Sequence, residues 1–232
     1  MQPPDLQREN VTVPGLSRAP AVDALTCCYD LVARLYLQGP EALRRHALPP
    51  LNPLLEGLAA IEPAWAEELG SLLASCDATA GRAELREEHA RIVTVPSAGR
   101  YIPPYGSVYL DGGTLWGPST LDVLRWYGAA GLEWQPGRQG PAGGIVSAPD
   151  HLGLEFAFLA LTRAAGATWK GGAGRGAQFA TGFLDAHVGR WLPAYRSALD
   201  SSGGAPLLGR FIGLAVELVV QDRATRAVSP MT

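Results

Sequence analysis

The chain has 232 residues, of which 47% are hydrophobic and 18% are charged, and its formal net charge at pH 7 is −3. This balance excludes the basic footprint of a nucleic-acid-binding protein, and it is compatible with a positively charged peptide partner. Three cysteines, two of them adjacent, form neither a disulfide framework nor a metal-binding Cys-x-x-Cys pair, so we expect a reducing compartment.

The sequence predicts neither a secretory signal nor a membrane span. The first ten residues lack the apolar region of a signal peptide. The most apolar stretch, Leu207 to Val220, is too short to cross a bilayer and contains Arg210 and Glu217. The pair Arg44-Arg45 lies well inside the chain, and we interpret it as a solvated helix face. A cytoplasmic protein without membrane insertion is therefore expected.

Helical periodicity runs through the first half of the chain. From Leu25 to Tyr36, apolar side chains recur at i, i+3 and i+4, which places them on one stripe of a helix. Prolines and short polar residues mark the further helix starts. The predicted helices cover about 25–36, 40–48, 53–61, 63–76 and 79–93, and the expected N-caps are Asn52, Glu62 and Thr79.

The second half of the chain continues the helical pattern. Pro118-Ser119 opens a helix that ends at Gly131, because glycine suits the left-handed position after a helix. The stretch that begins at Asp150 is apolar nearly all round, which is typical of a helix in the middle of a bundle. A further helix carries apolar residues to Trp191, and Pro193 is expected to kink or end it. Glycine-rich loops are predicted at 134–148 and 166–176, and the last helix at 207–222.

The fold predicted from these elements is all-α, a single irregular bundle of about nine helices. Alternation with a period of two is limited to Val108 and Leu110. We expect residues 21–224 to form one helical domain, with flexible segments at 1–20 and 225–232.

One connector interrupts the helical pattern, from Tyr101 to Asp111. Pro103-Pro104 forbids helix and favours an extended backbone, and Gly106 allows a bend. Two phenols and two aliphatic side chains follow closely. An ordered aromatic connector of this kind is either a functional segment or a loop whose tyrosines plug onto the core, and the residues alone leave both interpretations open.

Asp150, His151 and Glu155 form the most reactive-looking group. In a helix, His151 and Glu155 are i and i+4 neighbours on one face. A metal site would need further ligands, such as His187 or Glu88, from elsewhere in the chain. The simplest interpretation is that Asp150 caps the following helix while His151 packs beside it, although a capping carboxylate at a groove edge can also bind a partner.

Other motifs carry no chemistry. Gly171 to Gly176 lacks the preceding strand and the Lys-Ser/Thr of a phosphate-binding loop, so we interpret it as a linker. Ser107, Ser119 and Ser147 do not stand in a Gly-x-Ser-x-Gly setting. Cys27-Cys28 lies on the apolar stripe of the first helix, where packing explains it.

Three segments together carry a family resemblance: PPYGSVYLD, LWGPSTLDVLRWYGAAGLEW and APDHLGLEFAFL. Over roughly residues 20–200 the chain resembles the TorD/DmsD-like, NarJ-related family of cytoplasmic chaperones for molybdenum enzymes. Members of that family are all-helical and bind the twin-arginine signal peptide, the apoprotein, or both. The chain departs from the pattern at Ser147-Ala148-Pro149, where many relatives have an acidic residue, so any charge role there depends on Asp150.

The resemblance implies a chaperone, without catalytic activity, cofactor or metal, that binds an apo molybdopterin oxidoreductase catalytic subunit and its twin-arginine leader. We expect a monomer or a domain-swapped dimer. A twin-arginine leader has an arginine pair followed by an apolar stretch. A protein that binds it therefore needs a rim of carboxylates for the arginines and an apolar trough for the rest. The expected rim consists of Glu84, Glu87, Glu88, Asp111 and Asp150, and the expected trough of Tyr105, Val108, Tyr109, Leu110 and Trp116. The predicted client-binding residues are Tyr105, Ser107, Val108, Tyr109, Leu110, Asp111, Trp116, Pro149, Asp150, His151, Glu155 and Glu88. The alternatives are a small helical enzyme that uses Asp150, His151 and Glu155, and a structural subunit with a permanent interface.

Overall fold

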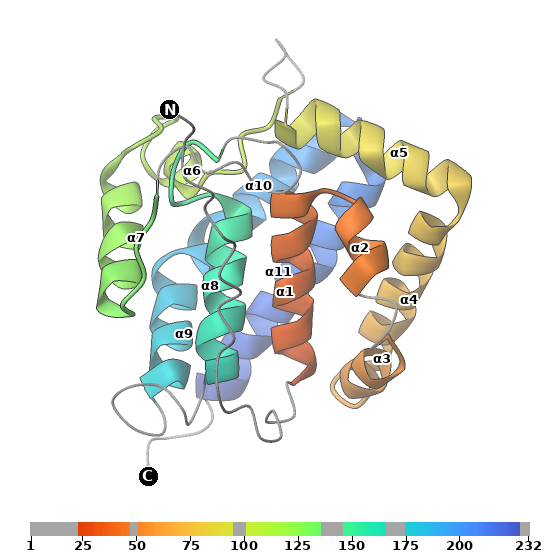
Figure 1. Cartoon of the computed structure of the whole chain (residues 1–232), viewed down its shortest axis with the longest axis horizontal. Coiled ribbons are helices and arrows are strands. Elements are labelled where there is room, and N and C mark those ends of the chain that lie inside the picture. The colour runs from red at the N-terminus through yellow and green to blue at the C-terminus, as the bar shows by residue number, and fades with distance from the viewer. Residues whose placement is uncertain (1–22, 47–50, 95–100, 136–145, 166–174, 228–232) are drawn as a thin grey trace, which may run out of the picture.

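The computed structural model describes residues 23–46, 51–94, 101–135, 146–165 and 175–227, which form an all-α bundle (Figure 1). Eleven α-helices and one short π-helix lie within these ranges, two α-helices more than predicted. The all-α class is confirmed. The segment 1–20 and most of both glycine-rich loops, which would have to rearrange in a domain swap, lie outside the described residues.

The first half of the bundle follows the predicted order of helices. Glu62 caps its helix as expected, with Pro63 in the first position. Two cap predictions are wrong: Asn52 lies inside the first turn, and Thr79 is the first helical residue after the cap position of Ala78. The elements are α1 (Ala24–Gln38), α2 (Glu41–His46), α3 (Leu51–Ala59), α4 (Pro63–Asp77), α5 (Thr79–His89) and the π-helix η1 (Ala90–Thr94).

The second half contains the two additional helices. One lies in the connector, and the other arises because the chain breaks at His187 and not at Pro193, which lies inside a helix. The last helix extends to Ala227, three residues into the predicted tail. The elements are α6 (Gly106–Leu110), α7 (Pro118–Ala129), α8 (Leu152–Ala165), α9 (Arg175–Ala186), α10 (Val188–Ser202) and α11 (Pro206–Ala227).

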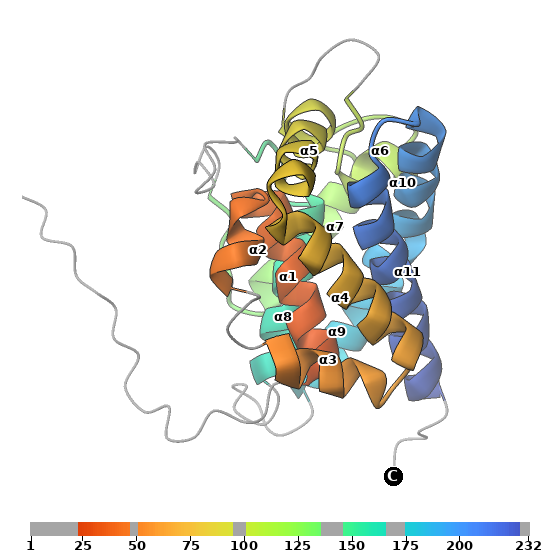
Figure 2. The same cartoon turned by 90° about the vertical axis from the view of Figure 1, so that its right-hand side faces the viewer.

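The centre of the bundle is the pair α1 and α8, which lie side by side (Figures 1 and 2). Tyr29 of α1 meets Phe156 of α8 edge-on with ring centroids 5.5 Å apart, and both side chains are fully buried. α9, α10 and α11 complete the core, while α3 and α4 pack as a hairpin against α1 and α11. Apolar burial along this central pair is the main stabilising contribution to the fold.

A buried ion pair ties three of these helices together at the end where α1 starts. Arg163 of α8 donates two hydrogen bonds of 2.9 Å to the carboxylate of Asp222 in α11. The same guanidinium donates to Asp23, the N-cap of α1, at 3.2 Å. Tyr29 donates to Asp222 at 3.0 Å. Because these charges are paired and hydrogen-bonded, their burial is compensated.

Candidate functional site

The connector is fixed to the start of α8 by its backbone. The N–H of Leu152 donates to the carbonyl of Pro104 at 2.8 Å, and the N–H of Gly106 donates to the carbonyl of Asp150 at 2.9 Å. After the extended diproline the chain turns into α6, which lies between α7 and α10 (Figure 1). The backbone is extended up to Tyr105 and turns at Gly106, where a bend was expected, but the short helix that begins there was not predicted.

Asp150 caps α6 and not the helix that follows it in sequence. One carboxylate oxygen accepts the N–H of Ser107 at 2.7 Å. The start of α8 is capped instead by His151, whose Nδ1 accepts the N–H of Gly153 at 3.1 Å. Burial and, to a lesser extent, the nearby His89 lower the pKa of His151 to about 3, so the ring is neutral at pH 7. The predicted Asp150 cap on α8 is thus replaced by two caps, one for each helix.

Glu155 is a fully buried carboxyl group beneath the connector. Its Oε2 accepts the indole N–H of Trp191 at 3.0 Å, whereas its Oε1 has no hydrogen-bond partner among the described residues. Burial raises the pKa of Glu155 well above its usual range, the charge of Asp150 raises it further, and the Trp191 hydrogen bond lowers it. Its buried surroundings therefore favour the neutral acid form of Glu155 over the ionised carboxylate.

Two other carboxylates of the predicted rim also cap helices. Glu88 accepts the N–H groups of Leu207 at 3.2 Å and Leu208 at 2.8 Å, at the start of α11. Asp111 accepts the N–H of Ser119 at 3.0 Å, at the start of α7. Free N–H groups at a helix start need such acceptors. Glu88, Asp111 and Asp150 are therefore structural in this conformation.

The two phenols of the connector have different surroundings. Tyr105 is buried, its hydroxyl accepts the N–H of Ser147 at 3.2 Å, and its ring meets His151 edge-on at 5.1 Å. Tyr109 is half-buried and stacks on Trp191 with ring centroids 5.6 Å apart. Tyr105 is thus a core residue, while Tyr109, with its half-buried neighbours Val108 and Leu110, is accessible from outside.

Trp116 is the most exposed of the predicted binding residues. Its side chain is 46% exposed, and its backbone has a φ of 63°, in the left-handed region that bulky residues avoid. Leu115 and Leu121 beside it in sequence are also exposed. The Trp116 ring meets Trp134 edge-on with centroids 5.1 Å apart. Backbone strain at an exposed aromatic residue is typical of functional sites.

Trp134 continues this surface into an apolar groove that the sequence analysis missed. The hollow has a volume of about 220 Å³ between the C-terminal end of α7, residues 132–134 and α8. Leu154, Ala157 and Leu161 form its α8 wall at i, i+3 and i+7, and Leu161 is 46% exposed. The prediction that α8 is buried on all sides is therefore wrong for the stripe of Leu154, Ala157 and Leu161. The groove is lined by Tyr127, Leu132, Glu133, Trp134, Leu154, Ala157, Phe158 and Leu161.

Comparison with known proteins matches this architecture to one family. The family model described as nitrate reductase delta subunit matches residues 56–196, a range that contains the connector, α6 to α8 and the apolar groove. No curated protein matches the chain. The chain belongs to the nitrate reductase delta subunit family. This is a family of maturation chaperones for molybdenum enzymes, which confirms the resemblance noted in the sequence and the general chaperone role.

The three residues of the catalytic alternative lie inside the bundle. Asp150, His151 and Glu155 are all buried, and His151 uses Nδ1 to cap α8. Within the described ranges, His, Cys, Asp and Glu side chains do not form a group of three or more that could hold a metal ion.

None of the helices described is long and apolar enough to cross a membrane.

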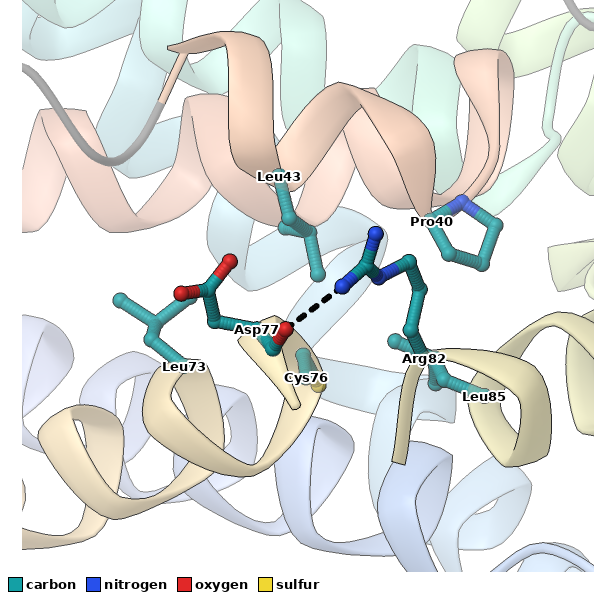
Figure 3. A pocket seen from close by; sticks show the side chains of 7 residues that line it. All are labelled: Pro40, Leu43, Leu73, Cys76, Asp77, Arg82 and Leu85. Carbon is teal, nitrogen blue, oxygen red and sulfur yellow. Dashed lines mark hydrogen bonds between the residues drawn. The ribbon is translucent and has the colours of Figure 1, made fainter. Parts of the chain in front are cut away.

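A second hollow between α2, α4 and α5 is too small to hold a ligand. Its volume is about 10 Å³, and Figure 3 shows Arg82 extending across it to donate to the backbone carbonyl of Asp77 at 2.7 Å. Pro40 and Leu43 close it from the side of α2. A space of this size accommodates about one water molecule. The apolar groove is therefore the better candidate site.

Proposed function

We propose that this chain is a cytoplasmic chaperone that binds the apo catalytic subunit of a molybdopterin oxidoreductase through its twin-arginine leader. Binding would delay export until the cofactor is in place. The observation that carries the proposal is the apolar groove beside α8, with the strained and exposed Trp116 at its edge. Family membership supports the chaperone role, and the groove supports the peptide ligand.

The groove has the chemistry that a leader peptide needs. A leader has an arginine pair followed by an apolar stretch, and such a stretch can fold into a helix when it enters a hydrophobic groove. The Leu154–Ala157–Leu161 stripe would contact one face of that helix. Trp116 and Trp134 would add a large aromatic contact area, and tryptophan is enriched among residues that dominate binding energy.

Glu133 is the best-placed acidic residue for the arginine pair. It lines the groove and is exposed, whereas Glu88, Asp111 and Asp150 accept hydrogen bonds from helix N–H groups. A guanidinium group pairs well with an exposed carboxylate, and such pairing weakens as salt screens it. We therefore assign arginine recognition to Glu133.

The predicted client-binding residues divide into an accessible set and a supporting set. Val108, Tyr109, Leu110, Asp111 and Trp116 are at least partly accessible. The others are buried, and we propose that they hold the connector and the start of α8 in position: Tyr105, Ser107, Pro149, Asp150, His151, Glu155 and Glu88.

A leader titration tests the proposal. A synthetic twin-arginine leader of a molybdopterin oxidoreductase is titrated against the wild type, Leu161→Asp and Val220→Asp. Both substitutions place a charge at an exposed apolar position, but Val220 lies on α11 and is not a groove residue. We expect Leu161→Asp to weaken binding about thirtyfold or more, roughly 2 kcal/mol, and Val220→Asp to leave it unchanged. Equal affinity of all three proteins would show that the groove is not the leader site.

A further inference from the structure

The buried carboxyl group of Glu155 lies directly under the first residue of α6. A Cβ atom added at Gly106 would lie 3.3 Å from Oε1 of Glu155 and 3.0 Å from Nε1 of Trp191. The backbone of α6 at Gly106 therefore packs directly against the hydrogen-bonded side chains of Glu155 and Trp191. Tyr109, in the same short helix, stacks on the Trp191 ring with centroids 5.6 Å apart.

Three polar atoms around this contact have no hydrogen-bond partner among the described residues. They are Oγ of Ser107, Oδ1 of Asp150 and Oε1 of Glu155, and all three side chains are fully buried. Unpaired buried polar groups favour any opening that returns them to water. α6 has only five residues, and so short a helix, with few hydrogen bonds of its own, is the kind of unit that opens locally.

We propose that Glu155 is a proton-operated latch for α6: the neutral acid allows the helix to close over it, and the ionised carboxylate releases the helix. The opened state would expose Glu155, Asp150 and Ser107 to water while the rest of the bundle stays folded. This device concerns the chain alone, so it holds or fails independently of the peptide-binding function.

Among the residues that the structure describes, the groups that face Glu155 give its ionised form no compensating positive charge. Asp150 adds a negative charge from the start of α8, and its neighbour His151 is neutral because burial lowers its pKa to about 3. α10 contributes the uncharged indole of Trp191, and α7 contributes the phenol of Tyr127, whose hydroxyl donates to the carbonyl of Pro149. His187 is paired with Asp122 at 3.1 Å, and burial lowers its pKa.

The direction of the pH dependence follows from this arrangement. The pKa of Glu155 is raised in the closed state and returns toward its usual value in the open state, where water reaches it. The closed state is therefore fully favoured below the open-state pKa, and it loses stability as the pH rises toward the closed-state pKa. A single site of this kind shifts the opening equilibrium by up to about tenfold per pH unit.

Hydrogen exchange of the α6 amides measures the latch. The opening equilibrium is compared between the wild type and Glu155→Gln at each pH, so that the intrinsic pH dependence of exchange cancels. Glutamine keeps the size of the side chain and cannot ionise. We expect the wild-type equilibrium to rise relative to Glu155→Gln by up to about tenfold per pH unit as the pH rises above the usual pKa range of glutamate. Glu56→Gln, at an exposed position in α3 away from the proposed binding site, serves as the control and should behave as the wild type.

A parallel pH dependence of α6 exchange in wild type and Glu155→Gln would overturn the inference. If Glu155→Gln does not fold, a carbon-13 titration of the glutamate carboxyl groups in the wild type decides instead. One glutamate must then titrate well above its usual pKa range, and the opening of α6 must increase over the same pH interval. If every glutamate titrated near its usual pKa, the proposal of a latch would also be wrong.

Discussion

The carboxylate of Asp150 accepts a hydrogen bond from the backbone N–H of Ser107, 2.7 Å away and 43 residues earlier in the chain. A helix of five residues has few internal hydrogen bonds, so this external acceptor matters for its formation. This hydrogen bond also explains why Asp150, the acidic residue of the segment APDHLGLEFAFL, is buried in this structure.

Removal of this cap should cost stability. We expect Asp150→Ala to lower the free energy of unfolding by about 0.5–2 kcal/mol, the range of lost helix caps. Asp150→Asn retains an accepting oxygen and should lose less. Urea denaturation of the three proteins measures both effects. An Asp150→Ala variant as stable as the wild type would contradict the cap.

The Arg163–Asp222 pair should be among the most sensitive polar contacts in the bundle. Arg163→Met leaves the buried Asp222 carboxylate without its guanidinium, and the expected loss is about 3–5 kcal/mol. Arg34→Met breaks an exposed i, i+4 pair with Asp30 and should cost no more than about 1 kcal/mol. Thermal and urea unfolding compare the two variants, and equal losses would show that the buried pair has no special weight.

Two glycines provide a matched test of the packing under α6. At Gly106 a methyl group would meet Trp191 and Glu155, so Gly106→Ala should destabilise by about 1–3 kcal/mol. At Gly128 in α7 the space is open, so Gly128→Ala should stabilise by about 0.5–1 kcal/mol through helix propensity. Urea unfolding measures both effects. If the two substitutions changed the free energy of unfolding in the same direction, the packing around Gly106 would differ from this description.

Much of the fold was predictable because its determinants are local. Pro63 and Pro118 occupy first helical positions as predicted, and Gly131 adopts a φ of 76° after α7. The break at His187 was not predictable from Pro193. At the break the backbone is closely packed, since a Cβ atom on Gly189 would lie 2.8 Å from the carbonyl oxygen of Leu184.

The site was harder to predict because its contacts join distant segments. The sequence shows that Glu88, Asp111 and Asp150 are acidic, but not that a helix start lies opposite each of them. The groove was missed for a related reason. An apolar helix predicts burial, and only the packing reveals that the stripe through Leu154 and Leu161 remains uncovered by the described residues.

The final prediction separates the two tyrosines of the connector. Tyr105 is 4% exposed, so Tyr105→Ala should cost several kcal/mol of stability, about 3–5 for a large aromatic residue in a core. Tyr109→Ala removes a half-buried ring that stacks on Trp191. The loss of this stacking should lower the free energy of unfolding by about 0.5–1.5 kcal/mol, in addition to the loss from the apolar area that is no longer buried. Thermal unfolding measures both losses.

Leader binding then decides whether the connector belongs to the peptide site. If Tyr109 extends the apolar groove, Tyr109→Ala should weaken leader affinity by about 2 kcal/mol, roughly thirtyfold, in a protein that remains folded. The Leu161→Asp variant provides the comparison, because it alters the groove without touching the connector. Wild-type affinity in Tyr109→Ala, together with weakened binding in Leu161→Asp, would confine the peptide to the groove and leave the connector as a structural plug. Tyr105→Ala cannot decide this question, since its effect on binding would follow from its effect on folding.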